Sequence, residues 1–179
     1  MLTPPPTLGR DEIVRRIPHQ GSMCLLDAVL AWDHDGIRCR ASSHLLADHP
    51  LRAHGRLGAA CGVEYAAQAM AVHGALLAER LDGGDGASAP PRAGYLAGMR
   101  GVTLHVERLD TIAGPLEVSA QRITGDGNTV LYGFAVQAGE QALLDGRALV
   151  VLDAAGRAPG RPHRSTVGEA SQRPEGHSP

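Results

Sequence analysis

Aromatic residues are scarce in this chain of 179 residues, in which Phe, Trp and Tyr together make up only 3%. So few rings leave little surface on which nucleic-acid bases could stack. The formal net charge at pH 7 is −2, so no broad basic surface indicates nucleic-acid binding either. These two shortages argue against a nucleic-acid-binding protein.

Cysteine and long apolar runs are also in short supply. The sequence contains only Cys24, Cys39 and Cys61. An odd number with no close pair predicts neither a disulfide framework nor a zinc site, so we expect three buried, reduced thiols. No uncharged apolar run is long enough to cross a bilayer, and the proline-rich start does not resemble a secretory signal. We therefore expect a cytoplasmic protein.

The length of the chain suits one domain with less regular ends. Three prolines predict an extended N-terminal segment over residues 1–8. Gly, Pro, Ser, His and charged residues dominate residues 154–179, which predicts a disordered tail. The single domain is expected over residues 9–153.

Within this domain, the spacing of apolar residues predicts one long helix among antiparallel strands. Alternation is typical of half-buried strands, and a helix rich in Ala, Leu, Val and Met favours burial. The expected elements are a helix over 9–17, strands over 24–32 and 36–43, a helix over 57–81, a loop over 82–92, and strands over 94–107, 114–124, 128–138 and 141–153. This order predicts an α+β layer fold.

Glu64 is the most informative residue, because it is the only charged residue between Leu57 and Ala78 on the predicted helix. Burying a carboxylate without a purpose is costly, so Glu64 is a candidate general acid or base. Gln68 follows four residues later on the same helix face and could orient it. The alternative is an exposed stripe on which Glu64 and Gln68 are merely solvated.

A second proton-transfer group is expected, because general acid–base catalysis commonly uses one group to take a proton and another to give one. The candidates are His19, His44, His49 and His54. His19 lies in a turn with constrained residues, whereas His49 and His54 lie just before the long helix. The residues alone leave open which of them lies near Glu64.

Glycines cluster at the start of the long helix, at Gly55, Gly58 and Gly62. Small residues there allow a substrate to approach the backbone, and free N–H groups at a helix start suit a developing oxyanion. Helix packing or turn geometry is the alternative explanation.

Three stretches of the sequence resemble the hot-dog 3-hydroxyacyl-[acyl-carrier-protein] dehydratases, above all the subgroup similar to the aryl polyene dehydratases. They are Ile17–Asp27, Gly62–Ala69 with its Glu-Tyr-Ala-Ala-Gln core, and Gly94–Arg100. The resemblance spans roughly residues 10–153. It implies a curved antiparallel sheet wrapped around one long central helix, and a dimer with the active site at the subunit interface.

The resemblance also implies roles for particular residues. Glu64 matches the helix carboxylate of the family, while Pro50 stands where the fatty-acid enzymes have their catalytic histidine. His19 is the better-placed substitute, although His49 is the neighbour of Pro50. Two further departures are Ala66, where Met is usual, and Gly58, where the subgroup tends to have Pro.

The implied reaction is the reversible dehydration of a 3-hydroxyacyl thioester to a trans-2-enoyl thioester. His19 and Glu64 would be the catalytic pair, and Gly58, Gly62 and Gln68 would contact the substrate. No metal or redox cofactor is expected, since the acyl group would arrive on the phosphopantetheine of an acyl carrier protein. That acidic partner could dock on some of the arginines Arg52, Arg56, Arg92, Arg100 and Arg108.

Two alternatives remain open at this point. The first is a hot-dog acyl thioesterase that uses Glu64 alone to activate water or attack the carbonyl. The second is a weakly active or inactive partner subunit of a heterodimeric dehydratase, which the missing histidine at Pro50 keeps under consideration. The sequence leaves homodimer and heterodimer undecided.

Overall fold

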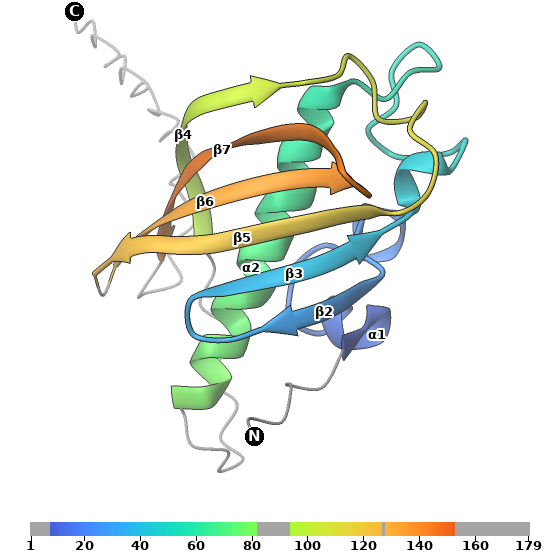
Figure 1. Ribbon diagram of the computed structural model, residues 1–179. Helices are drawn as coiled ribbons and strands as arrows, with labels where there is room; N and C mark the ends of the chain where they lie inside the picture. Colours follow the sequence, from blue (N-terminus) through green and yellow to red (C-terminus); the bar gives the residue numbers. More distant parts are fainter. Residues whose placement is uncertain (1–7, 82–93, 127, 153–179) are drawn as a thin grey trace, which may run out of the picture.

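A long helix lies in the concave face of a single curved antiparallel sheet (Figure 1). The computed structural model describes residues 8–81, 94–126 and 128–152. Within these residues, seven strands follow the order β1-β2-β3-β5-β6-β7-β4. This is the hot-dog fold, as the sequence predicted.

The elements follow one another along the chain nearly as expected. They are β1 (Leu8–Gly9), α1 (Arg10–Val14), β2 (Ala28–Trp32), β3 (Gly36–Ala41), α2 (Gly62–Leu81), β4 (Gly94–Leu104), β5 (Leu116–Gly125), β6 (Thr129–Ala138) and β7 (Gln141–Leu152). Short 3₁₀ turns lie at Gly21–Met23, Ser43–Leu45 and Ala59–Cys61. In the described part of the chain, neither α1 nor α2 is long and apolar enough to cross a membrane.

The core forms between α2 and the inner face of the sheet. Alternate residues of β6, from Val130 to Val136, are buried against the helix, and their neighbours face outward. On α2, Tyr65, Ala69 and Val72 are completely buried. Because both surfaces are apolar, their burial holds the helix across the sheet.

The long helix begins at Gly62 rather than at Leu57. Residues before Gly62 bond to a neighbouring loop instead: Ala59 N–H donates to Glu107 O at 3.0 Å and Leu109 N–H to Leu57 O at 2.8 Å. These contacts hold the backbone in an extended path that a helix could not follow. The sequence pattern, which shows only apolar character, does not reveal this competition.

The strand expected over residues 24–32 begins only at Ala28. Leu25 is fully buried, but its N–H donates to the side chain of Gln68 at 2.8 Å instead of to another strand. The strand predicted over 94–107 ends at Leu104, and the helix predicted over 9–17 ends at Val14. Cys24 and Cys39 are buried, whereas Cys61 is only half-buried, so that part of the expectation was wrong.

Some predictions fall on residues outside those described. The loop over 82–92, the tail over 154–179 and residues 1–7 of the predicted extended segment belong to this group. Leu8, the last residue of that segment, pairs with Val29 in the sheet.

Candidate active site

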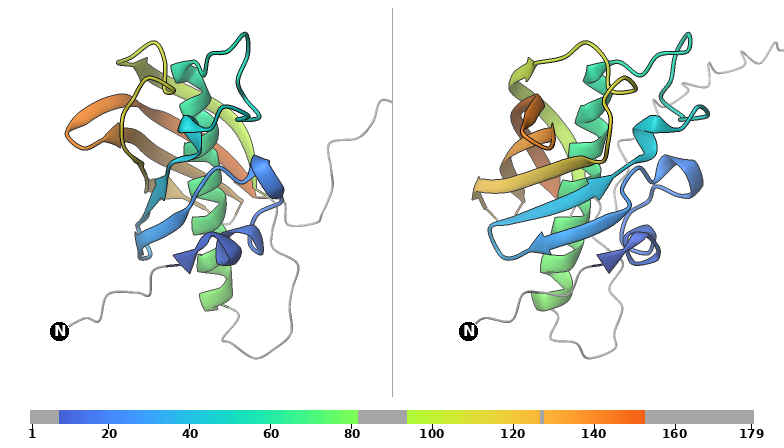
Figure 2. Two further views of the ribbon diagram at one scale, coloured as in Figure 1. Left: turned by 90° about the vertical axis from the view of Figure 1, so that its right-hand side faces the viewer. Right: turned by 45° about the vertical axis from the view of Figure 1, so that its right-hand side comes forward.

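His19 and Glu64 meet beside the first turns of α2. The His19 Nε2 atom lies 3.1 Å from Glu64 Oε1, and the side chains are 29% and 33% exposed. Both groups are therefore half-buried but still open to a small molecule. The segment that carries His19 passes alongside α2 (Figure 2), so the tertiary fold creates this pair.

Gln68 fixes the orientation of the Glu64 carboxyl group. Its Nε2 donates to Glu64 Oε1 at 3.0 Å and to the carbonyl of Met23 at 2.8 Å. Its Oε1 accepts the Leu25 N–H at 2.8 Å, which requires the amide to have this orientation. Since Gln68 donates to Glu64 Oε1 and His19 lies beside the same oxygen, Oε2 is the oxygen left to face a substrate.

The turn that carries His19 is fastened to α1. Gln20 Nε2 donates to the carbonyls of Val14 at 3.0 Å and Ile17 at 3.3 Å, and Arg10 Nη2 donates to Gly21 O at 2.9 Å. His19 Nδ1 is buried and has no hydrogen-bond partner among the described residues. Nε2 is therefore the nitrogen that can reach a substrate.

His49, the neighbour of Pro50, serves a different purpose. It is 3% exposed, and its Nδ1 accepts the Leu51 N–H at 3.1 Å. Nε2 therefore carries the proton and donates to the Tyr65 hydroxyl at 2.9 Å. Burial lowers the pKa of His49, so the ring stays neutral near pH 7. The structure places His49 with Tyr65 and not with Glu64.

His44 and His54 also lie apart from the pair. His44 is fully buried, its Nε2 lies 3.2 Å from the carbonyl of Ile112, and burial lowers its pKa. His54 is exposed on the turn before α2, with a left-handed φ of 51°. Of the four candidate histidines, His19 is the one that contacts Glu64.

Tyr65 is a residue of this region that the sequence analysis did not single out. Its hydroxyl donates to Ser43 Oγ at 2.9 Å, and Ser43 Oγ in turn donates to Leu25 O at 2.8 Å. Burial raises the pKa of Tyr65 to about 12, so it remains a phenol. Gln68 accepts the Leu25 N–H and Ser43 donates to the Leu25 carbonyl, so both backbone polar groups of Leu25 are bonded. These bonds fix the segment that follows His19. The sequence feature that could have pointed to Tyr65 is its position directly after Glu64.

The backbone donors at the helix start are fewer than expected. Ala59 N–H donates to Glu107 O, and Cys61 N–H donates to Gly58 O, each at 3.0 Å, while Gly62 N–H donates to Ala59 O. Gly58 and Ala60 are the positions of this stretch whose N–H groups have no backbone acceptor among the described residues. The possible oxyanion donors are therefore these two and not Gly62.

The glycines of this region occupy their positions for different structural reasons. A Cβ at Gly62 would lie 2.3 Å from Leu144 Cδ2, so close packing against β7 requires this glycine. Gly55 has a φ of +73°, which a turn requires. A Cβ would meet nothing within 4 Å at Gly58 or at Gly55, so both leave open space beside the backbone, and Gly58 is the nearer of the two to the helix start.

The arginines proposed to dock a carrier fall into two groups. Arg52 and Arg108 both bind Asp110, at 3.2 and 2.6 Å, and Arg108 holds the pKa of that carboxyl group well below its usual range. Arg56 and Arg100 are exposed and have no carboxylate within 4.0 Å in the described part of the chain. Arg92 lies outside the described residues.

The fold and the site define a hot-dog protein whose long helix carries a carboxylate beside a histidine. The family model named ApeP-like, for the ApeP dehydratase, matches residues 12–155. The chain therefore belongs to the ApeP-like dehydratase family.

Solved structures share the fold at low sequence identity. The dehydratase heterocomplex ApeI:P from Xenorhabdus doucetiae is 20% identical with a TM-score of 0.66, over 79% of this chain and 90% of that chain. A thioesterase family protein from Silicibacter pomeroyi is 10% identical with a TM-score of 0.55, over 79% of this chain and 96% of that chain. No curated protein matches the sequence at a significant level.

Proposed function

We propose that this chain is a 3-hydroxyacyl-[acyl-carrier-protein] dehydratase-like hydro-lyase. It would convert a 3-hydroxyacyl thioester into a trans-2-enoyl thioester and water. The observation that carries the proposal is the 3.1 Å contact between His19 Nε2 and Glu64 Oε1 in a member of a dehydratase family. Elimination needs a base at C2 and an acid at the 3-hydroxyl group, and the pair offers one of each.

The proton count of the pair suits an elimination. A proton can pass between the two groups, because His19 Nε2 lies 3.1 Å from Glu64 Oε1. In the reactive form, Glu64 is a neutral acid and His19 is a neutral imidazole protonated at Nδ1. Nε2 takes the C2 proton, the C2–H electron pair becomes the double bond, and Glu64 Oε2 protonates the departing hydroxyl. Proton transfer from His19 to Glu64 then restores the starting state.

Other groups of the site would support this chemistry. The N–H groups of Gly58 and Ala60 are the donors we assign to the thioester carbonyl, where negative charge builds up as the C2 proton leaves. Gln68 would orient Glu64 rather than contact the substrate, because its amide already binds Glu64, Met23 and Leu25. The chemistry needs no metal or redox cofactor.

The proposed substrate is carried on the phosphopantetheine of an acyl carrier protein, and the proposed partner is a second hot-dog subunit. The similarity to a dehydratase heterocomplex supports a heterodimer. The strand β4 supports a dimer of either kind, since it is an edge of the sheet in the described part of the chain.

Hydration of a crotonyl thioester by the purified chain tests the activity, measured as loss of the ultraviolet absorption of the enoyl thioester. Glu64→Gln should lower the rate at least about 100-fold, because it removes the acid while keeping the shape of the side chain. Glu140→Gln, an exposed substitution in the turn after β6, is the matched control and should have no effect. An unchanged rate in Glu64→Gln would refute the proposal.

A hot-dog acyl thioesterase is the second candidate, favoured by the similarity to a thioesterase family protein. It would use Glu64 to activate water or attack the carbonyl. Product analysis separates the two activities, because a hydrolase releases a free thiol whereas a dehydratase leaves the thioester intact. A chain that is inactive alone but active when combined with another hot-dog subunit would indicate the partner role.

A further inference from the structure

Among the described residues, the strand β4 is an edge of the sheet with no strand beyond it. It pairs only with β7, and all of its 11 residues are exposed. Leu96, Met99 and Leu104 lie opposite β7 residues whose side chains face inward, yet they are 42%, 44% and 48% exposed. A long edge strand with apolar side chains is a ready template for another strand. The charges along this edge therefore influence which strand can pair with it.

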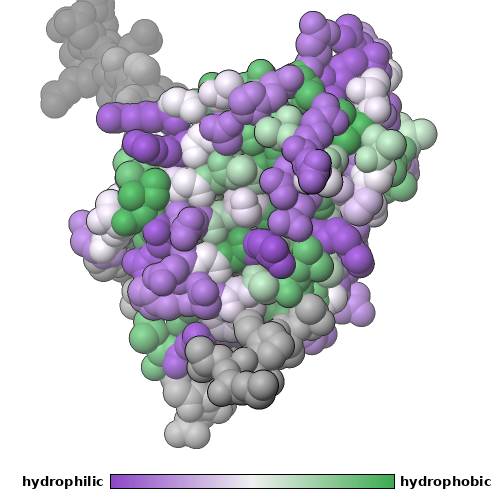
Figure 3. All heavy atoms as spheres, in the orientation of Figure 1, coloured by the Kyte–Doolittle hydropathy of each residue, from purple (hydrophilic) through white to green (hydrophobic). Residues whose placement is uncertain are grey.

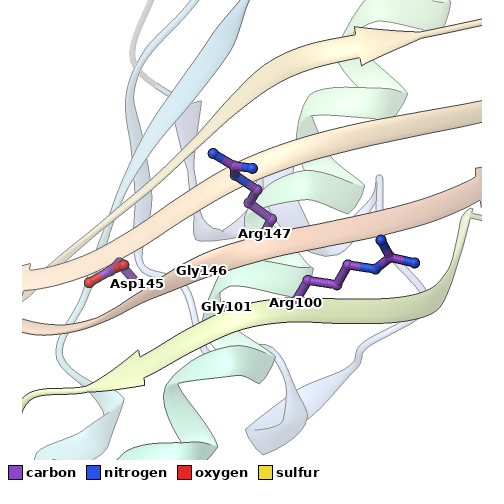
Figure 4. A pocket seen from close by; sticks show the side chains of 5 residues that line it. All are labelled: Arg100, Gly101, Asp145, Gly146 and Arg147. Atoms are coloured by element: carbon purple, nitrogen blue, oxygen red, sulfur yellow. The ribbon is translucent and has the colours of Figure 1, made fainter.

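Two arginines lie side by side at the middle of this edge. Arg100 of β4 is the direct neighbour of Arg147 of β7 in the sheet. Both are exposed, and because the adjacent Ala148 is buried, Arg147 points to the outer face of the sheet (Figure 4). That outer face carries polar residues among apolar ones (Figure 3). Neighbouring like charges on one face disfavour sheet pairing unless an opposite charge joins them.

The described residues offer these arginines no such charge. Arg100 and Arg147 line a hollow of about 330 Å³ with Gly101, Asp145 and Gly146. Asp145 is the only carboxylate in its lining, and His105 Nε2 binds its Oδ2 at 2.6 Å. No carboxylate of the described part lies within 4.0 Å of either guanidinium group. The two charges thus remain available at the edge.

Pairing of β4 with a second copy of itself would add to this charge. The strand runs from Gly94 to Leu104, so a two-fold antiparallel pairing that uses its full length is centred on Met99. In that register, the two Arg100 residues are diagonal neighbours about 7–8 Å apart on one face. With Arg147 of each copy, four guanidinium groups would form one row across the interface.

We propose that Arg100 and Arg147 select the partner of β4. They disfavour pairing of this chain with itself and favour a second hot-dog subunit whose edge strand places a carboxylate beside Arg100. This inference rests on the proposed function only in taking the partner to be a hot-dog subunit. It assigns the choice between homodimer and heterodimer to two named side chains.

A charge-reversed copy of the full chain serves as the test partner. Sedimentation equilibrium would measure the dimer dissociation constants of the wild type, of the double variant Arg100→Glu, Arg147→Glu, and of their equimolar mixture. We expect the mixture to form a 1:1 dimer at least tenfold tighter than either protein alone. Raising the salt from about 0.05 to about 0.5 M should weaken the mixed dimer and strengthen wild-type self-association.

Two variants control for effects other than charge. Arg40→Glu reverses an exposed charge on β3, which β5, β6 and β7 separate from β4, and should not pair with the wild type. The double variant Arg100→Lys, Arg147→Lys keeps the charge and should behave as the wild type. If the double Glu variant does not fold, Arg100→Glu alone in the same mixture gives the answer.

Two results would overturn the inference: a wild-type homodimer as tight as the mixed dimer, or a mixture that stays monomeric. Neither result depends on catalysis. Glu64→Gln should self-associate as the wild type does, so a failure of the proposed function is distinguishable from a failure of this inference.

Discussion

The imidazole of His19 lies within hydrogen-bonding distance of the Glu64 carboxyl group, at 3.1 Å, and both belong to the same chain. The contact depends on a turn after α1 and on the first turns of α2, which Gln68 joins by bonding to Met23 and Leu25. The geometry of the pair is therefore set by buried hydrogen bonds rather than by the two side chains alone.

We expect His19→Asn to lower kcat for thioester hydration by about 10²- to 10⁴-fold, because it removes the base that accepts the C2 proton. KM should change little, since Asn is polar and close in size to the imidazole that it replaces. Steady-state kinetics with a crotonyl thioester would measure both constants. His54→Asn, an exposed histidine before α2, is the control and should retain wild-type kinetics. Equal losses in the two variants would argue against a specific role for His19.

Gln68→Leu should reduce both stability and activity. The substitution leaves the buried Leu25 N–H without its acceptor and frees the Glu64 carboxyl group to rotate. A buried donor without a partner costs about 1–3 kcal/mol, which urea denaturation would measure. Gln137→Leu, on the exposed side of β6, should leave the free energy of unfolding nearly unchanged. A Gln68→Leu protein with wild-type kcat would show that Glu64 needs no orientation.

The two helical glycines of α2 should respond to alanine in opposite directions. At Gly62, the new Cβ would lie 2.3 Å from Leu144 Cδ2, so Leu144 must shift and the protein should lose about 1–3 kcal/mol. At Gly74, a Cβ meets nothing within 4 Å, so the higher helix propensity of alanine should add about 0.5–1 kcal/mol. Thermal or urea denaturation of the two variants checks the difference, and equal effects would contradict the packing at Gly62.

Stability should fall as the pH drops below about 6.5, the usual pKa of histidine. His73 is fully buried, its Nδ1 accepting from the Tyr132 hydroxyl and its Nε2 donating to Asp33 O, each at 2.9 Å. Burial lowers its pKa, as it does for His44 and His49. Below the unfolded-state pKa, the unfolded chain binds protons that the folded chain excludes, so unfolding becomes easier; above it, these groups give no pH dependence.

Urea denaturation at several pH values between about 5 and 8 would test this pH dependence. Below about pH 6.5, the free energy of unfolding of His73→Gln should fall less steeply than that of the wild type. The reason is that the variant lacks one histidine that excludes a proton in the folded state. A free energy of unfolding that is constant over this range would show that the buried histidines take up protons as easily as they do in the unfolded chain.

The sequence predicted those features that depend on local pattern. Alternating residues marked β3 and β6, and the lone carboxylate on an apolar helix marked Glu64. It could not predict that Leu25 would bond to a side chain instead of a strand, since Gln68 is distant in sequence. For the same reason, it could not tell which histidine reaches Glu64. The family resemblance favoured His19 over His49, and a buried tyrosine hydroxyl binds His49 instead.

The single-chain origin of the His19–Glu64 pair bears on how such a protein could evolve. A pair divided between two subunits ties the sequences of both genes together, because a change in either one removes half of the proton-transfer chemistry. Here one gene would transmit the whole pair. A companion subunit could then lose its own acid and base and diverge toward recognising other acyl chains, while this chain continued to supply both groups.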